Sequence, residues 1–342
     1  MDALSRLLSL HPVRAALDIR CRFGEPWNLQ HEARALGVAP YHFILEGQAR
    51  LEVEGHPPMQ LLPGDLVLFA RGAAHCLHTA SPEQASVVRV VDAASPVRLH
   101  VNGDAAGDGP ALSDFLCGQF HFESPQSNAL MQALPEVMLV RGAELPDGHG
   151  LRTLATLLRD ECGGAHGDGG EREGAQAVVA GLAAALFGLA IRAWLGRGGP
   201  QPGLLALLAH PRLQHAVRAM LGASQEDWSL ERLAEVSHLS RATFARQFRE
   251  VGGATPGELL QQLRMAQAAR LLSYSKMGTA EIGEAVGYQS EAAFNRVFKK
   301  YSGMGPGSYR RRLRAGEPDA APGATTQAQN GSGSEKEAAA KR

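Results

Sequence analysis

Two segments of the chain repeat the same pattern fifty positions apart. The repeated residues are Ser240, Phe244, Arg246 and Phe248, followed by Ser290, Phe294, Arg296 and Phe298. On a helix, the two phenylalanines of each copy lie four residues apart and share one face, while the arginine between them points outward. Each copy therefore predicts a helix with one buried face and one basic face, as in the second helix of a helix-turn-helix.

A shorter amphipathic segment precedes each copy. Ser229 is a suitable N-cap for a helix over 229–236, and residues 279–286 repeat that helix ahead of Gly287, which can adopt a positive φ in the turn. Pro256 can open a longer helix between the two copies. The chain therefore predicts two helix-turn-helix units held apart by one helix, an arrangement that can read DNA at two neighbouring places.

The second copy carries the more specific pattern. The stretch 282–300, followed by Pro306, resembles the signature of AraC/XylS-type transcription regulators. Two positions depart from that signature: Gly283 stands where the family usually has Ala, and Gly305 replaces the usual Thr before Pro306. Neither change removes a side chain that would face DNA, although Gly283 costs up to ~1 kcal/mol relative to Ala in a helix.

The resemblance implies which side chains face DNA. They are Arg241, Ala242, Ala245 and Arg246 in the first copy, and Ser290, Glu291, Ala292, Asn295 and Arg296 in the second. Arginine can make a bidentate contact with guanine, and a small side chain can contact the thymine methyl group. Lys299, Lys300 and Arg310 to Arg312 are expected to contact phosphates. The alternative for any one of these basic residues is an ordinary solvated charge.

Charge is unevenly placed along the 342 residues. Between Gln225 and Arg314 there are 14 Lys and Arg against 9 Asp and Glu, whereas the whole chain has a net charge of −1. A basic module joined to an acidic one is typical of a nucleic-acid binder attached to a sensing domain. The modest excess argues against a non-specific DNA binder. We find no apolar run of transmembrane length and no signal-peptide pattern, so we expect a cytoplasmic protein that does not enter a membrane.

The N-terminal half has the pattern of a small β-barrel or sandwich. Short apolar and alternating runs are separated by Gly and Pro, and the predicted strands cover 41–45, 49–53, 65–69, 86–91 and 115–122. Helices are predicted over 151–162 and 176–195. The second of these is apolar on nearly every side, so we expect it to pack on the barrel and to offer part of a homodimer interface.

The order of polar residues in this half resembles the cupin barrel that precedes many AraC-type modules. His42 and Glu46 come first, the tight turn at 63–65 follows, and His75 comes last. His42, Glu46 and His75 stand where metal-binding cupins keep their ligands, and two or more histidines with a carboxylate can hold Fe, Mn or Zn. The usual His-x-His pair is missing, and His31 or His78 completes a set only if the fold brings it close. We therefore expect no metal or other cofactor.

These patterns predict an α+β chain of two domains. An N-terminal cupin-like β-barrel with flanking helices, for sensing and dimerisation, covers 1–195, and a linker covers 196–210. An all-α module of two helix-turn-helix motifs joined by a long helix covers 211–314. Residues 315–342 are rich in Glu, Pro, Ala, Gly, Gln and Ser and are expected to be a disordered tail.

Cysteines supply the candidate trigger. The four are Cys21, Cys76, Cys117 and Cys162, with no Cys-x-x-Cys pair, which excludes a zinc ribbon. Cys21 lies between Arg20 and Arg22, whose charge is expected to favour the thiolate and its oxidation. The opening segment 1–8, Cys21, the segment 27–31, His42, Ala74-His75 and Cys117-Gly118 together resemble the AraC-type subgroup that answers reactive chlorine species. That resemblance implies that Cys21 and Cys117 are the redox-sensing residues.

The expected function is a sequence-specific transcription regulator, an activator acting with RNA polymerase, switched by cysteine oxidation. An oxidised Cys21 would be captured as a disulfide by Cys117 or by a second subunit. The alternative within the same class is a small organic ligand in a barrel pocket lined by Tyr41, Phe43 and His75. The alternative from another class is a metal-dependent cupin enzyme, which leaves the duplicated DNA reader unexplained.

Overall fold

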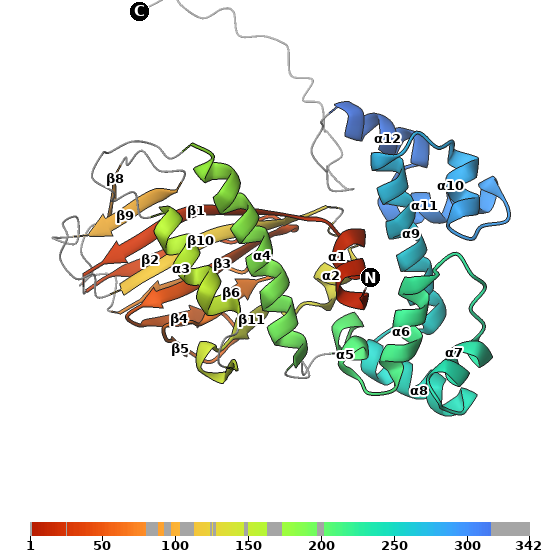
Figure 1. The fold of residues 1–342 in the computed structure, drawn as a ribbon, viewed down its shortest axis with the longest axis horizontal. Helices are drawn as coiled ribbons and strands as arrows, with labels where there is room; N and C mark the ends of the chain where they lie inside the picture. Colours follow the sequence, from red (N-terminus) through yellow and green to blue (C-terminus); the bar gives the residue numbers. More distant parts are fainter. Residues whose placement is uncertain are drawn as a thin grey trace, which may run out of the picture.

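The structure is a computed structural model, and it describes residues 2–315 except 25, 80–87, 92–96, 103–112, 124, 126–127, 147–149, 163–172 and 197–201. The described residues form two lobes (Figure 1). The first lobe contains all of the described strands, and the second is helical. This division confirms the predicted α+β chain with a strand-rich N-terminal part and a helical C-terminal part.

The strands of the first lobe form two sheets. They are β1 (Val13–Phe23), β2 (Asn28–His31), β3 (Val38–Glu46), β4 (Ala49–Val53), β5 (Met59–Leu61), β6 (Leu66–Phe69), β7 (His75–His78), β8 (Val88–Val91), β9 (Arg98–Asn102), β10 (Ser113–Phe122) and β11 (Val137–Val140). The larger sheet has the order β11-β6-β3-β10-β1-β9-β8, and the smaller has the order β2-β7-β4-β5. Every predicted strand overlaps one of these, although 86–87 lie outside the described residues.

The larger sheet has a core on each face. Because side chains alternate along a strand, Tyr41 and Phe43 of β3 face the helices, whereas Ile44 faces the smaller sheet. Between the sheets lie the rings of Phe23, Trp27, Phe69 and Phe115, all essentially inaccessible to solvent. The interior of the barrel is therefore filled with side chains.

Five helical segments belong to the first lobe. They are α1 (Ala3–Leu10), α2 (Ala129–Ala133), the short 3-10 helix η3 (Gly142–Glu144), α3 (Gly150–Cys162) and α4 (Ala175–Gly196). α3 and α4 cover the outer face of the larger sheet (Figure 1). α3 buries Leu151, Leu154 and Leu158, spaced as one face of a helix. The helices predicted over 151–162 and 176–195 are thus present.

α4 corrects the expectation that the chain has no apolar run of transmembrane length. It has 22 residues and a mean hydropathy of 2.0 in its most apolar window, enough to cross a membrane by length and composition. The core helix of a globular domain meets the same test, and α4 packs against β1 through buried residues such as Ala183, Phe187 and Ile191. Packing on the sheet therefore accounts for one face of α4, and 39% of its most apolar window is buried.

Helices of the second lobe follow the predicted duplication. They are α5 (Leu204–Ala209), α6 (Leu213–Gly222), α7 (Leu230–Val236), α8 (Arg241–Gly252), α9 (Pro256–Tyr274), α10 (Thr279–Ala285), α11 (Glu291–Ser302) and α12 (Pro306–Ala315). Ser229 caps α7, Pro256 opens α9, and Gly287 has a φ of 86° in the turn before α11. The corresponding turn of the first copy holds His238 at a φ of 53°. The two predicted helix-turn-helix units are α7–α8 and α10–α11.

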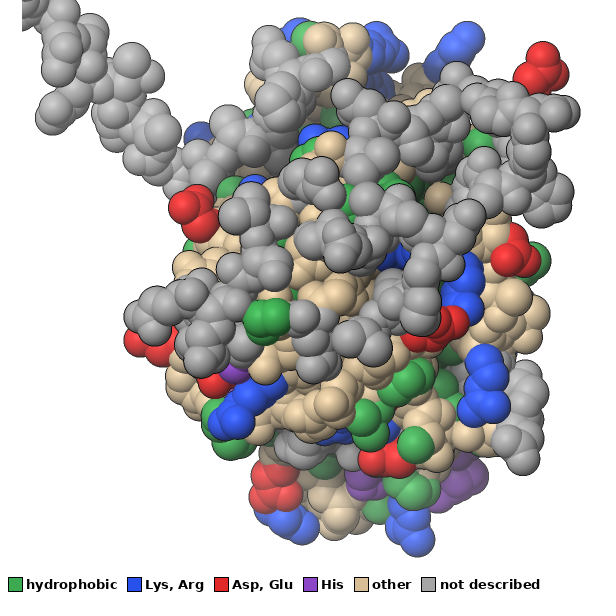
Figure 2. Space-filling view, turned by 90° about the vertical axis from the view of Figure 1, so that its left-hand side faces the viewer, with side chains coloured by type: hydrophobic (Ala, Val, Ile, Leu, Met, Phe, Trp, Pro, Cys, Tyr) green, Lys and Arg blue, Asp and Glu red, His purple; other side chains and the backbone are tan. Residues whose placement is uncertain are grey.

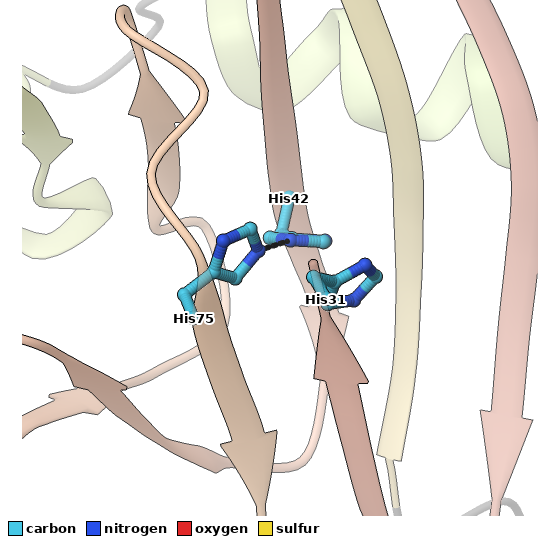
Figure 3. A group of neighbouring side chains, drawn as sticks. All are labelled: His31, His42 and His75. Atoms are coloured by element: carbon cyan, nitrogen blue, oxygen red, sulfur yellow. Dashed lines mark hydrogen bonds between the residues drawn. The ribbon is translucent and has the colours of Figure 1, made fainter. Parts of the chain in front are cut away.

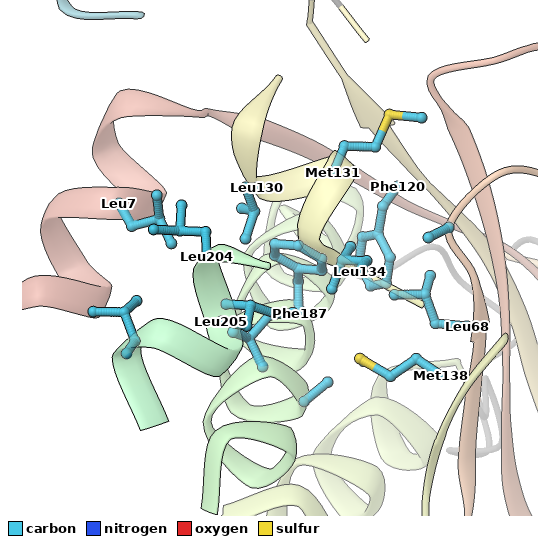
Figure 4. Packing of buried hydrophobic residues seen from close by; sticks show 14 of the residues in the cluster. Leu7, Leu68, Phe120, Leu130, Met131, Leu134, Met138, Phe187, Leu204 and Leu205 are labelled. Atoms are coloured by element: carbon cyan, nitrogen blue, oxygen red, sulfur yellow. The ribbon is translucent and has the colours of Figure 1, made fainter. Parts of the chain in front are cut away.

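The predicted linker 196–210 is corrected by α5. Its sequence, LLALLA, is apolar on all sides, and Leu204, Leu205 and Leu207 are buried. Figure 4 shows Leu204 and Leu205 packed among Leu7 of α1, Leu130 of α2 and Phe187 of α4. Residues 204–209 therefore join the two lobes as part of a shared core. Residues 197–201 and the predicted tail from 316 onward lie outside the described residues.

Candidate nucleic-acid interface and sensing core

The predicted recognition helices are α8 and α11. Ser240 accepts a hydrogen bond from the backbone N–H of Thr243, and Ser290 accepts one from Ala293, both at 3.3 Å, so each serine begins its helix as an N-cap. Phe244 and Phe248 are fully buried in the first copy, as are Phe294 and Phe298 in the second. The phenylalanines hold each helix to its lobe and leave the opposite face outward.

The two copies match in exposure residue by residue. The pattern of buried, half-buried and exposed positions over 241–250 is the same as that over 291–300. Arg241, Ala242, Arg246, Glu291, Ala292 and Arg296 are exposed, and Ala245 and Asn295 are half-buried. The match continues beyond the predicted repeat, because left-handed Gly253 and Gly303 end the two helices and Pro256 and Pro306 begin the next ones.

Ion pairs distinguish the two outward faces. Arg241 lies 3.0 Å from Glu231, and the Arg246 guanidinium lies 3.0 Å from the carboxylate of Glu250 one helical turn later. In the second copy the residue one turn after Arg296 is Lys300, and the described residues place no carboxylate within ion-pair distance of Arg296. Arg246 must leave its partner to contact a base, whereas Arg296 has no such partner to leave.

The residues expected at phosphates divide into two groups. Lys299 and Lys300 are exposed in the last turn of α11. Arg310 instead donates hydrogen bonds to the carbonyl oxygens of Leu272 at 3.3 Å and Met277 at 2.7 Å, so it holds the C-terminal end of α9. The expectation that Arg310 contacts a phosphate is therefore wrong for the free protein, because its guanidinium is engaged inside the lobe.

Arg264 was missed by the sequence analysis. It lies on α9 and donates hydrogen bonds to the carbonyl oxygens of Ser224 at 2.8 Å and Glu226 at 2.9 Å, in the loop that leads to α7. Its guanidinium also lies over the ring of Tyr288, just before α11. A Cβ at Gly287 would meet this guanidinium and the carbonyl of Gln225, so only glycine fits. These contacts tie the loop before α7 and the turn between α10 and α11 to α9.

Cys21 and Cys117 lie side by side between the two sheets. β1 and β10 are antiparallel, Ile19 faces Cys117 and Cys21 faces Phe115, so the two cysteines are diagonal neighbours. Both are buried in the same core, and their thiols are hydrogen-bonded to each other. The structure thus brings together the two thiols that the resemblance singled out.

The expected thiolate at Cys21 is corrected by the structure. Burial, with the hydrogen bond to Cys117, raises the pKa of Cys21 well above its usual range. Arg20 does not offset this effect, because neighbouring residues on a strand point to opposite faces and Arg20 pairs with Asp114 at 2.6 Å. Cys21 is therefore a neutral thiol in the reduced protein.

A chain of hydrogen bonds continues from Cys117. The sulfur lies 2.9 Å from His42 Nδ1, and His42 Nε2 lies 2.7 Å from His75 Nε2. His75 Nδ1 lies 2.8 Å from the carbonyl oxygen of Ala73, so Nδ1 must carry the proton and Nε2 the lone pair. His42 then donates through Nε2 and accepts the Cys117 S–H at Nδ1. One consistent set of donors and acceptors links Cys117 to the backbone at Ala73.

His31 completes a cluster with the other two histidines (Figure 3). One ring nitrogen from each of His31, His42 and His75 lies within 4.8 Å of the others. Burial lowers the pKa of His42 well below its usual range, that of His75 to about 4 and that of His31 to about 3. All three rings are therefore neutral near pH 7. His78, the other possible addition, instead faces Glu52 at 3.3 Å.

Glu46, predicted with His42 and His75, is not part of this cluster. It is exposed, and its carboxylate lies 2.6 Å from Arg159 of α3. The register between β3 and β10 shifts between the pairs Ile44–Phe115 and Glu46–Asp114, which marks a bulge. The bulge turns Glu46 away from the face that carries His42. This local irregularity has no signal in the sequence.

The predicted ligand pocket is also corrected. Tyr41 and Phe43 are fully buried on the helix side of the larger sheet, opposite to His75, so the three do not line one cavity. Among the described residues, a cavity of about 430 Å³ lies between the sheet and α3, lined by residues that include Leu45, Arg152 and Arg159.

The other two cysteines have different surroundings. Cys162 lies in the core beneath α3, where burial raises its pKa to about 12. Cys76 is half-buried on β7 and donates to Asn28 Oδ1 at 3.6 Å.

Figure 2 shows the strand-rich end of the molecule, where acidic and basic side chains are scattered singly over the described surface. The described part of that face offers no broad basic surface for DNA.

Comparisons with known proteins agree with this division. Residues 2–196 match a family described as "Cupin", and residues 233–312 match one described as "Helix-turn-helix domain". The first match covers more than half of the chain and confirms the cupin-like N-terminal domain.

Several curated relatives match most of the chain. The RCS-specific HTH-type transcriptional activator RclR of Escherichia coli (strain K12) is 31% identical over 295 residues, covering 85% of this chain and 90% of that protein. An HTH-type transcriptional regulator of Haemophilus influenzae is 30% identical, covering 85% and 92%. MtrA of Neisseria gonorrhoeae, an HTH-type transcriptional regulator, is 25% identical, covering 85% and 91%.

Solved structures include similar chains. The DNA-binding domain of AdpA, crystallised with a target DNA, is 32% identical, and the match covers 32% of this chain and all of that one with a TM-score of 0.31. ToxT of Vibrio cholerae with a bound unsaturated fatty acid is 11% identical, covering 88% and 94% with a TM-score of 0.34.

The relatives described above are transcription regulators, and none of them is named as an enzyme. Duplicated helix-turn-helix units follow a cupin domain in this chain, as the two family matches require. The protein therefore belongs to the AraC-type family of DNA-binding transcription regulators.

Proposed function

We propose that this regulator is a sequence-specific activator switched by oxidation of Cys21 and Cys117. The observation that carries the proposal is the pair of buried, hydrogen-bonded thiols on neighbouring strands of the sensing domain. The name of the Escherichia coli relative, an RCS-specific activator, supports reactive chlorine as the oxidant. Family membership alone gives neither the trigger nor the direction of regulation, so both are part of this proposal.

The chemistry suits a neutral thiol. Hypochlorous acid is small and uncharged when protonated, so it can enter a core that excludes anions. It transfers its chlorine to the sulfur of Cys21, giving a sulfenyl chloride and water. The Cys117 sulfur then attacks that sulfur, the S–Cl bond breaks, and a disulfide, chloride and a proton are formed. Hypochlorous acid is reduced by two electrons, and the two thiols supply them.

Closing that disulfide moves the sheet. Diagonal neighbours in an antiparallel pair have Cα atoms ~7–8 Å apart, whereas a disulfide needs them within ~7 Å. β1 must therefore shift toward β10. β1 begins at Val13, three residues after α1 ends, and Leu7 and Leu10 of α1 are buried in the core shared with the DNA-binding lobe. We infer that α1 carries the shift to that lobe.

The DNA-binding lobe grips two segments of one groove in this proposal. α9 has 19 residues and thus spans about 28 Å, and the major groove repeats every ~34 Å along B-DNA. Exposed Arg241, Arg246 and Arg296 would read bases, and Lys299 and Lys300 would bind phosphates. The regulator would act in the cytoplasm, where the DNA is, and recruit RNA polymerase.

The direct test is footprinting and in vitro transcription on the DNA upstream of the protein's own gene, with and without hypochlorite. Cys21→Ser and Cys117→Ser should abolish the hypochlorite response and keep basal DNA binding. Cys76→Ser is the matched control, because Cys76 is more exposed than either thiol and should leave the response intact. Peptide mass mapping should find the Cys21–Cys117 disulfide. An unchanged response in Cys21→Ser would remove the redox trigger.

A second trigger is favoured by the cavity beside α3. Its volume of about 430 Å³ suits a small organic molecule. Arg152 gives its rim a positive charge, whereas Arg159 at the same rim is paired with Glu46. An organic anion bound there would contact α3 and the β3 bulge. Arg152→Ala would then abolish induction by that anion while leaving the hypochlorite response unchanged, so the two triggers are separable.

We also propose that the regulator is a homodimer through the outer faces of α3 and α4. Leu157 of α3 is 49% exposed and Val178 of α4 is 47% exposed. A charge at either position, as in Val178→Asp, should turn a dimer into a monomer in sedimentation measurements. A variant that sediments like the wild type would place the dimer contact elsewhere.

A further inference from the structure

We propose that His31, His42 and His75 form a binding site for one divalent transition-metal ion of the zinc or cobalt class in the sensing domain. The inference does not depend on the redox trigger, and it concerns three side chains on three different strands. β2 ends at His31, β3 carries His42 in its middle, and β7 begins at His75. Figure 3 shows the three imidazoles converging between these strands.

Unsatisfied polar atoms in this core point to a ligand. His31 Nε2 is buried and has no hydrogen-bond partner among the residues that the structure describes. Such an atom loses its bonds to water without replacement, which destabilises the folded protein. A metal ion accepts the lone pair that no protein group uses. The rings also lie close together: His31 stacks on His75 with centroids 4.6 Å apart, and the tilted pair of His31 and His42 has centroids 4.7 Å apart.

The distances need only a small adjustment. Ligand nitrogens ~2.1 Å from a tetrahedral ion lie about 3.4 Å from one another. The His42–His75 pair at 2.7 Å would open slightly, and His31, whose ring nitrogen lies within 4.8 Å of theirs, would turn inward. Phe69 stacks on His75 at 3.7 Å and keeps that ring in place while the others adjust.

Two outer contacts already orient the ligands. His75 donates Nδ1–H to the carbonyl oxygen of Ala73, which leaves Nε2 for the ion. Metal-binding histidines typically donate their second ring nitrogen in this way. His42 would bind through Nε2, so its proton moves to Nδ1 and is donated to Cys117 Sγ, 2.9 Å away. The proton changes nitrogen within one ring, and the S–H of Cys117 turns aside. Cys117 thus becomes a positioning residue for the ion.

An entry path reaches the cluster from the surface. An open hollow is lined by residues that include His31, His75, Glu52, Glu54 and His56. The two glutamates give its mouth a negative charge that attracts cations. Because the inner donors are imidazole nitrogens with no carboxylate among them, the site selects Zn²⁺ or Co²⁺ over Mg²⁺ and Ca²⁺, which prefer oxygen.

The test is metal titration of the purified, metal-free full-length chain, with Co²⁺ followed by its visible absorption and Zn²⁺ by competition and by elemental analysis after desalting. One equivalent should bind, and Mg²⁺ or Ca²⁺ should not displace it. His31→Ala and His75→Ala should each weaken binding by at least a hundredfold. His56→Ala, which lines the same hollow outside the cluster, should leave binding within twofold.

Folding and the role of Cys117 are controlled in the same series. Circular dichroism and thermal melting should show that His31→Gln folds like the wild type, and Zn²⁺ should raise the melting temperature of the wild type and not of His31→Gln. Cys117→Ala should weaken Co²⁺ binding about tenfold without adding or removing a charge-transfer band. Binding of less than one equivalent by the wild type, or equal affinity in His31→Ala, His75→Ala and His56→Ala, would overturn the proposal.

Discussion

The two helix-turn-helix units share one pattern of exposure and differ in what holds them. α7 and α8 bury Leu233, Phe244 and Phe248 in the same core as α1, α4 and α5 of the first lobe. α10 and α11 bury Phe294 and Phe298 in a separate core with α12. α9 belongs to both cores, since Leu263 lies in the first and Leu272 in the second. The sensing domain therefore holds the first unit directly and the second mainly through α9.

The largest expected effect is the loss of stability when a buried phenylalanine is replaced, and it tests whether the two units have separate cores. Phe294→Ala should cost about 3–5 kcal/mol and melt only the second unit, which calorimetry should show as a separate transition at low temperature. Phe244→Ala has the same chemistry but should lower the main transition, because its core extends into the first lobe. A single transition shifted equally by both variants would mean that the two cores unfold as one.

The next largest effect is a loss of folding stability at low pH, and it should affect the first lobe, which contains His11. His11 follows α1 and is only 3% exposed, and burial lowers its pKa from 6.5 to about 4. The unfolded chain therefore binds a proton that the folded chain does not, so stability is full above pH 6.5 and falls as pH drops toward 4. His11 alone should account for about 2 kcal/mol of lost stability at pH 5.

Other titratable groups near His11 sit on neighbouring elements. The small hollow beside it is lined by Glu123, Arg270, Tyr274, Tyr301 and Tyr309, among others. Urea unfolding at pH 7.5 and pH 5 measures the total loss, to which buried His31, His42 and His75 also contribute. His11→Gln should remove only its own share, about 2 kcal/mol. His56→Gln, at a half-buried position, is the control and should keep the full pH dependence. Equal slopes in both variants would assign the acid sensitivity to another group.

Ion pairing should make the two recognition helices unequal in DNA binding. Arg296→Ala should weaken specific binding about tenfold, about 1.4 kcal/mol, because this guanidinium has no carboxylate to leave. Arg246→Ala should weaken it only about threefold, since the wild-type arginine first gives up Glu250. Electrophoretic mobility shifts at fixed salt measure both. Arg249→Ala, outside the predicted DNA-facing set, is the control, and a larger loss in Arg246→Ala than in Arg296→Ala would reverse the comparison.

The smallest effect comes from Glu250 itself. Exposed pairs one helical turn apart are worth ~0.3–0.5 kcal/mol, so Glu250→Gln should raise DNA affinity about twofold by releasing Arg246. The second copy has Lys300 at the matching position and already lacks this restraint. Titrations at two salt concentrations should show the gain shrinking as salt rises. Glu235→Gln on α7, also exposed, tests whether any lost carboxylate has the same effect.

Local patterns were sufficient for the helical lobe. The spacing of Phe244 and Phe248, the cap at Ser229 and the turn at Gly287 each depend on residues a few positions apart, and each is present in the structure. α5 was missed because a run of leucines and alanines beside glycines gives no amphipathic period, and its burial depends on α1 and α2. The helix α5 is therefore stabilised by contacts with residues far away in the sequence.

The sensing core depended more on distant contacts. Cys21 and Cys117 were paired by resemblance, and the register of β1 and β10 places them together. The prediction of a thiolate at Cys21 was wrong because side chains alternate along the strand, which places Arg20 on the other face, beside Asp114. The predicted cluster contained Glu46, whereas the structure has His31 in its place beside His42 and His75. This difference depends on the bulge in β3 and on the pairing of β2 with β7, and neither has a signal in a single sequence.

The continuous helix α9 has a consequence for the operators this regulator can occupy. Arg264 of α9 contacts both the loop before the first unit and the turn of the second, so their separation and mutual rotation do not adjust independently. One base pair inserted between the two contacted segments turns the second by about 34° around the duplex axis. A stiff protein cannot follow that rotation, so spacer length should discriminate between promoters as strongly as base identity does.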